Sequence, residues 1–422
     1  DFMDLIETFG AKIGALSEEK PQRARQLLTA GFRANGVKNK LASKRSSKSD
    51  RMLFQLVNRA MVTCLAKPQS NVMVSLFTPC EMLHLQGLHP YSCEGFSSYL
   101  SGAMAEQPFL HQAEDTGIPN SLCSYHKVFI GAAQMGLMPK PRFILSTSLA
   151  CDANTLTFRH LAQFYDVPHF NVDIPFESSP QAVDYVAGQL RQMGEFLTQQ
   201  TGLPLDDGQL ARTVARSQRT MALYHRGLRL RAGRQVLSDL TSELLRTAAF
   251  HFLLGTPETE AYARQLLREI TTAPPAQGKQ LLWIHTPPYW VAPLRHLFAQ
   301  SPRVQVAACD MSYEGIVEAD PTKPYEAMAR RLVYSPFNGP AQRRIDRALE
   351  MAKTVGADGA VWFCHWGCKH TLGGARLGKK ALEEAGLPTL LLDGDSCDRG
   401  FGGEGQAATR MEAFLEVLEG MA

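Results

Sequence analysis

The chain has 422 residues, of which 45% are hydrophobic and 20% charged, as in a soluble globular protein. No apolar run approaches the roughly 18 residues that cross a membrane, and no signal peptide is visible, so we expect a cytoplasmic protein without a membrane anchor. A net charge of only +3, from 44 basic and 41 acidic residues, argues against a nucleic-acid partner.

The first part of the chain predicts helices followed by an α/β lobe. Residues 1–60 are polar with helical spacing and end in a basic linker, residues 38–51. Residues 61–190 contain three short apolar runs, each followed by a helical pattern; these runs are residues 71–77, 142–148 and 169–175. Strands that alternate with helices predict right-handed βαβ units and a parallel sheet.

A helical connection and a second α/β lobe follow. Residues 191–272 contain helical patterns and no convincing strand. Residues 273–422 return to the alternation, with apolar runs at residues 280–286, 304–310, 359–364 and 388–395. We therefore expect an α/β protein of two similar lobes, joined by helices and preceded by a helical segment.

Nine cysteines are spread along the chain, an odd number that argues against a disulfide framework. No CxxC pair and no GxxxxGK[ST] loop occurs, so thioredoxin-type redox chemistry and phosphate binding by a P-loop are unsupported. Cys151, Cys309, Cys364 and Cys368 lie near the ends of predicted strands. Because ligands collect at the carboxyl ends of parallel strands, cysteines of both lobes could face one crevice.

A metal site built from cysteines distant in sequence is the chemistry that this pattern favours. Cys93, Cys123 and the segment "CHWGCKH" (residues 364–370) each stand near the start of a predicted helix, where the helix dipole favours a thiolate. Three thiolates would leave one iron of a cubane open, just as three ligands leave a catalytic zinc open. Spacing alone leaves iron–sulfur and zinc as alternatives, and any single cysteine could be a buried thiol. We place His365 and His370 around such a site rather than in it.

Five motifs in a fixed order carry a resemblance to a known family. They are "PCEMLHLQGLHPYSC", "LCSYHKVFIGAA", "TSLACDANTLTFRHLAQFYDVPHFNVDIP", "GADGAVWFCHWGCK" and "ALEEAGLPTLLLDGDSCD". Together they span most of residues 70–420, and the chain resembles the 2-hydroxyacyl-CoA dehydratase D-component family. That family is related to benzoyl-CoA reductase subunits and to double-cubane cluster proteins.

The resemblance implies two Rossmann-like lobes that hold a [4Fe-4S] cluster between them. By motif, the ligands would be Cys93, Cys123 and Cys368, with Cys364 and Cys151 as further candidate ligands. The surplus of cysteines leaves open a larger, double-cubane cluster. Glu81 matches a Pro-x-Glu position and would be either structural or a proton-transfer group.

The resemblance also implies an activity and partners. An ATP-dependent activator with its own iron–sulfur cluster would supply an electron at low potential. This protein would then use radical chemistry to dehydrate an acyl-CoA thioester, as a homodimer or as a heterodimer with a related subunit. Two alternatives are a double-cubane-type reductase of small molecules and a non-catalytic electron-relay subunit.

Overall fold

A computed structural model describes residues 2–41, 46–236, 238–299, 301–312 and 318–421. The chain begins with three helices, α1 (Phe2–Glu19), α2 (Pro21–Leu41) and α3 (Lys48–Ala66), which confirms the helical N-terminal segment. Of the expected basic linker, residues 42–45 lie outside the described residues, and Lys48 to Arg51 form the first turn of α3. No helix within the described ranges is both long and apolar enough to span a bilayer.

The first lobe is a four-stranded parallel sheet with helices around it. Its strands are β1 (Asn71–Val74), β2 (His89–Ser92), β3 (Phe143–Thr147) and β4 (His169–Val172). Its helices are α4 (Glu81–Leu85), α5 (Cys93–Gly102), α6 (Gln107–Asp115), α7 (Ser124–Gln134) and α8 (Asp152–Tyr165). The apolar runs predicted β1, β3 and β4. They did not predict β2, which has only four residues and contains Pro90.

Four helices connect the lobes: α9 (Pro180–Thr201), α10 (Asp207–Leu230), α11 (Leu240–Phe252) and α12 (Pro257–Thr272). Local sequence explains the length of α9. The Ser179 hydroxyl accepts a hydrogen bond from the Ala182 amide at 3.1 Å, Pro180 starts the helix, and Gly202 ends it with a φ of 74°. The expected domain boundary at residue 190 falls inside this helix, and the other domain limits stay predictions.

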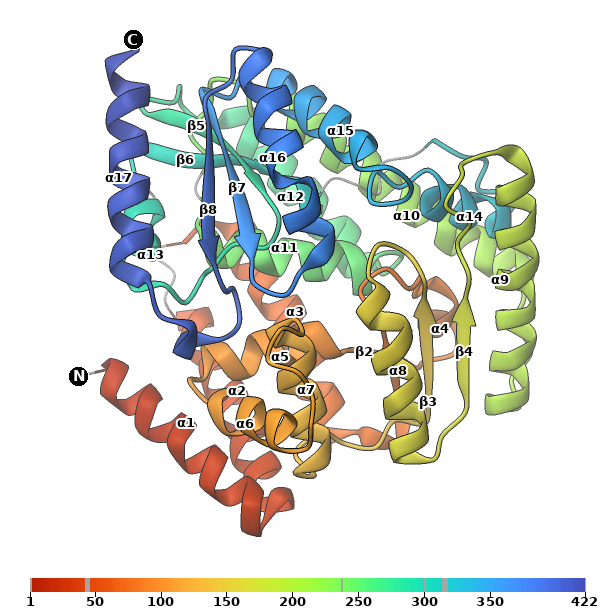
Figure 1. Cartoon of the computed structure of the whole chain (residues 1–422). Coiled ribbons are helices and arrows are strands. Elements are labelled where there is room, and N and C mark those ends of the chain that lie inside the picture. The colour runs from red at the N-terminus through yellow and green to blue at the C-terminus, as the bar shows by residue number, and fades with distance from the viewer. Residues whose placement is uncertain (1, 42–45, 237, 300, 313–317, 422) are drawn as a thin grey trace.

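The second lobe repeats the architecture of the first. Its strands are β5 (Lys279–Ile284), β6 (Val304–Cys309), β7 (Gly359–His365) and β8 (Thr389–Gly394). Its helices are α13 (Ala292–Phe298), α14 (Pro324–Val333), α15 (Ala341–Val355), α16 (Lys369–Glu384) and α17 (Glu404–Gly420). The strand orders are β2-β1-β3-β4 and β6-β5-β7-β8, all parallel, so both lobes have the same topology (Figure 1).

One of the hydrophobic clusters of the protein extends through both lobes. A continuous cluster of buried side chains runs from Val74 in β1 through Leu245 in α11 to Trp362 in β7. The α14 helix belongs to the second lobe by sequence but packs along α9 beside the first sheet (Figure 1). In both sheets the order reverses between the first and third strands, and such switch points position ligands at the carboxyl ends of the strands.

Candidate functional site

A cavity of about 1360 Å³ lies at the carboxyl ends of the strands of both sheets. Its wall includes residues that follow strands of each lobe: Ser148 after β3, His285 after β5, Met311 after β6 and Gly367 after β7. Typical small-molecule pockets occupy roughly 300–1,000 Å³. The volume therefore fits a ligand larger than most metabolites, or a cofactor together with its substrate.

Three cysteines line this cavity, and each directly precedes a helix. Cys123 is the N-cap of α7, Cys151 of α8 and Cys368 of α16. The amino end of a helix carries partial positive charge, which favours a thiolate and hence metal binding. Two of these cysteines come from the first lobe and one from the second, so the group exists only when the lobes are packed together.

Cys151 and Cys368 occupy equivalent places in the two lobes. Each caps the helix that follows the third strand of its sheet, and each comes after a residue with a left-handed backbone. Ala150 has a φ of 65° and Gly367 a φ of 78°. The repeated topology thus directs one cysteine from each sheet into the cavity.

Gly367 also holds the Cys368 loop against Cys123. A Cβ atom on Gly367 would lie 2.6 Å from the Cys123 backbone nitrogen and 2.7 Å from its Cα. Such contacts are too short for any side chain, so a glycine is required here for both space and backbone conformation. This close approach brings two loops that are distant in sequence into direct contact.

The thiols influence one another through their charges. Burial raises the pKa of Cys123 well above its usual range, and the neighbouring sulfurs of Cys368 and Cys151 add to the rise. Burial, followed by the charge of Cys368, raises the pKa of Cys151 to about 12. Without a metal, Cys123 and Cys151 are therefore protonated thiols, and a metal that bound them would deprotonate them.

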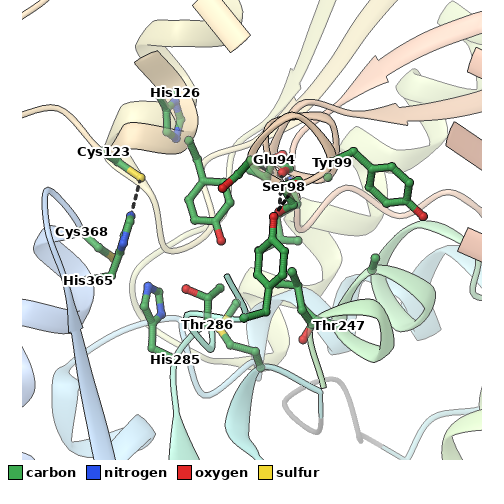
Figure 2. A pocket seen from close by; sticks show the side chains of 18 of the residues that line it. Glu94, Ser98, Tyr99, Cys123, His126, Thr247, His285, Thr286, His365 and Cys368 are labelled. Carbon is green, nitrogen blue, oxygen red and sulfur yellow. Dashed lines mark hydrogen bonds between the residues drawn. The ribbon is translucent and has the colours of Figure 1, made fainter. Parts of the chain in front are cut away.

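Neutral histidines face two of the three sulfurs. The Ser396 amide donates to His365 Nδ1 at 3.1 Å, so the proton of His365 is on Nε2, which lies 3.2 Å from Cys123 Sγ (Figure 2). His126 Nε2 lies 3.8 Å from Cys151 Sγ. Burial lowers the pKa of His126 to about 3 and also lowers that of His365, although Asp395 opposes the second shift.

Comparison with known proteins places the chain in a family. The family model of the 2-hydroxyglutaryl-CoA dehydratase D-component matches residues 75–418, which contain every strand of both sheets except β1 and all three cavity cysteines. The chain belongs to this dehydratase D-component family. It is also 22% identical over 333 residues to the alpha subunit of an (R)-phenyllactyl-CoA dehydratase from Clostridium sporogenes, covering 74% of this chain and 80% of that subunit.

Two of the three ligands expected from sequence line the cavity of this D-component. Cys123 and Cys368 do so, and so does Cys151, one of the additional candidates. Cys93 starts α5 with its side chain fully buried in the core cluster that also contains Tyr91, and it does not line the cavity. Cys364 is buried within β7 and does not line it either.

Glu81 lies outside the cavity in a buried ion pair. Its two oxygens accept hydrogen bonds from Arg331 at 2.7 and 3.0 Å, and Ser217 donates another at 2.9 Å. Burial alone would raise the pKa of Glu81, but the Arg331 guanidinium outweighs burial and holds it below its usual value. The contacts are those of a residue that joins α4 to α14.

Sequence patterns did not single out His285 or His126. His285 follows β5 and lines the cavity. Its backbone is left-handed, a conformation that the sequence pattern does not predict. His126 stands in the first turn of α7, three residues after Cys123, and this spacing was the signal that could have indicated it. Only the three-dimensional structure shows that both histidines line the cavity.

Proposed function

We propose that this protein is the iron–sulfur component of a dehydratase that removes water from a 2-hydroxyacyl-CoA thioester. The observation that carries this proposal is the convergence of Cys123, Cys151 and Cys368, from both lobes, on one large cavity. Membership of the dehydratase D-component family supports the reaction class. The relative from Clostridium sporogenes is named as a subunit of a phenyllactyl-CoA dehydratase, which supports an acyl-CoA substrate for this protein.

Cys123, Cys151 and Cys368 would hold a [4Fe-4S] cluster. Among the described residues, no three His, Cys, Asp or Glu side chains stand close enough to bind a single metal ion. A four-iron cluster spaces its ligands more widely, because each thiolate binds a different iron. When bound, such a cluster supplies one-electron chemistry and one iron that has no protein ligand.

The remaining residues would orient the thiolates and exclude water. The Nε2–H group of His365 is directed at Cys123, and surrounding hydrogen bonds of this kind fix and tune metal ligands. Tyr289, Trp290 and Phe337 line the cavity and are buried, which offers an apolar surface to an acyl chain. A dry cavity strengthens electrostatic interactions and limits side reactions of reactive species.

We also propose two protein partners. A low-potential electron would come from an ATP-dependent activator that contains its own cluster. The name of the relative, an alpha subunit, supports assembly with a second, related subunit. The second subunit would be an addition to the cavity of this chain, which is formed by this chain's own residues.

The test is anaerobic purification of the full chain followed by iron and sulfide analysis and an activity assay. We expect about four irons per chain and, with an activator, ATP and a reductant, loss of water from a 2-hydroxyacyl-CoA. About eight irons per chain would favour the double-cubane alternative. A protein that contains a cluster but never dehydrates any 2-hydroxyacyl-CoA with its activator would be an electron relay and would contradict the proposal.

A further inference from the structure

Among the described histidines that line the cavity, His285 differs from the others because its ring nitrogens have no hydrogen-bond partner. His126, His365 and His370 each use both ring nitrogens for contacts inside the protein. Within the described part of the chain, neither ring nitrogen of His285 has a hydrogen-bond partner, and its Nδ1 is shielded from solvent. Buried polar groups without partners are rare and call for an explanation.

The backbone of His285 holds this ring in place at a conformational cost. Its φ of 83° is in the left-handed region that non-glycine residues seldom adopt. The conformation is kept because the His285 amide donates to Asp310 Oδ1 at 2.7 Å, and Arg344 holds the other oxygen of Asp310 at 2.8 Å. Strain that is stabilised in this way is characteristic of binding and catalytic positions.

The ring of His285 lies beside His365, which contacts one of the cavity cysteines. Its centroid is 5.8 Å from that of His365, the residue whose Nε2 contacts Cys123. Figure 2 shows the two imidazoles near each other, with Cys123 and Cys368 close to His365. His285 and His365 both line the cavity, so a substrate bound in this part of it would lie beside both imidazoles.

The chemistry of the ring matches a hydroxyl group. Burial, assisted by the positive charge of Arg344, keeps the pKa of His285 well below its usual range, so the ring is neutral. Each nitrogen of a neutral imidazole either donates or accepts a hydrogen bond, according to the tautomer, and a hydroxyl group can pair with it in either role. A thioester carbonyl could use only the donor.

We propose that His285 binds the 2-hydroxyl group of the acyl-CoA substrate and so distinguishes a 2-hydroxyacyl thioester from its analogue without the hydroxyl. This inference rests on the proposed function, because it takes acyl-CoA as the ligand. It adds a residue that contacts substrate and determines specificity.

The experiment measures dissociation constants of the full, anaerobically purified chain for two matched ligand pairs. The pairs are phenyllactyl-CoA with 3-phenylpropanoyl-CoA, and 2-hydroxybutyryl-CoA with butyryl-CoA. For the pair that binds, we expect wild-type protein to prefer the hydroxylated ligand by about three- to tenfold, the effect of one hydrogen bond. His285→Phe should reduce this ratio to about one, because the ring loses both hydrogen-bonding groups.

Two further variants make the comparison specific. His285→Asn should retain part of the preference, since asparagine offers a donor and an acceptor and tolerates a left-handed backbone. His160→Phe is the control: it makes the same chemical change on the exposed surface of α8, outside the cavity, so the ratio should stay at its wild-type value. Within each ligand pair, general effects of a substitution on folding cancel.

The outcomes separate this inference from the proposed function. Equal binding of both members of a pair by wild-type protein would overturn the role of His285 while leaving acyl-CoA as the ligand. So would an unchanged preference in His285→Phe. Failure of all four thioesters to bind wild-type protein would instead contradict the proposed function itself. The wild-type comparison needs no variant, so it remains decisive even where a substitution prevents folding.

Discussion

At the scale of single residues, Gly367 determines whether the Cys368 and Cys123 loops can meet. We predict that Gly367→Ala lowers stability by clearly more than the roughly 1–2 kcal/mol that a left-handed backbone costs an alanine, because the new methyl group would also collide with the Cys123 backbone. We further predict that this variant loses bound iron. Urea unfolding and iron analysis of anaerobically purified protein provide the two measurements.

Gly386 supplies a matched control for that substitution. It has a φ of 83°, close to that of Gly367, but a Cβ atom there would meet nothing within 4 Å. Gly386→Ala should therefore cost only the backbone term, about 1–2 kcal/mol, and should keep its iron. Equal effects of the two substitutions would show that the loop contact at Gly367 has no special role.

Sequence predicted members of the candidate site only where the residue type itself, cysteine, is a common metal ligand. Cys123 and Cys368 were expected as ligands and do reach the cavity, and Cys151 was among the further candidates. Cys93 has the same side chain as these three, but at the start of α5 this side chain is buried in the core. His285 depends on a left-handed backbone, and only tertiary contacts decide such a conformation.

At the scale of secondary-structure elements, the Glu81–Arg331 pair joins α4 of the first lobe to α14. Glu81 is fully buried while Arg331 is 15% exposed, so removing the charge of Glu81 takes away the carboxylate that this largely buried arginine binds. We predict that Glu81→Gln destabilises the protein by about 3 kcal/mol, the lower end of the range for breaking a buried pair. Urea unfolding at neutral pH measures this loss, and unchanged stability together with lost activity would instead indicate a proton-transfer role.

The same pair predicts a pH dependence. Because Arg331 holds the pKa of Glu81 below its unfolded value, the folded protein binds fewer protons at this group than the unfolded chain. The stabilisation is therefore fully present above an unfolded glutamate pKa of about 4.3 and is lost as the pH falls through the lower, folded value. The stability difference between wild-type protein and Glu81→Gln should shrink on acidification below pH of about 4; a constant difference would contradict this assignment.

Apolar runs were sufficient to predict most strands, and β2 shows why one was missed. It contains Pro90, which cannot donate to a neighbouring strand and which therefore argues against a central strand. The structure places β2 at the edge of its sheet, next to β1 only, where a proline is tolerated. Composition could not distinguish such an edge strand from a loop.

At the scale of the whole molecule, the shared cluster predicts that the two lobes unfold together. All four tryptophans, at positions 283, 290, 362 and 366, belong to the second lobe, so their fluorescence reports on that lobe and on its contacts with the first. Far-ultraviolet circular dichroism reports on helices throughout the chain. Because the largely continuous cluster from Val74 to Trp362 couples the lobes, we expect both signals to change at the same urea concentration.

Two separated transitions would show instead that the lobes unfold independently. The shared cluster would then not couple the stability of one lobe to that of the other. The alternation of strands and helices predicted two parallel sheets. It could not predict that α14 would pack along α9 or that one buried cluster would extend through both lobes, because those contacts depend on side chains far apart in sequence.

The most direct test of the central claim compares the iron content of single cysteine variants. We predict that anaerobically purified Cys123→Ala, Cys151→Ala and Cys368→Ala each lose the cluster. Cys93→Ala, which replaces a fully buried cysteine outside the cavity, should retain about four irons per chain. Full iron in Cys151→Ala together with loss of iron in Cys93→Ala would contradict the account.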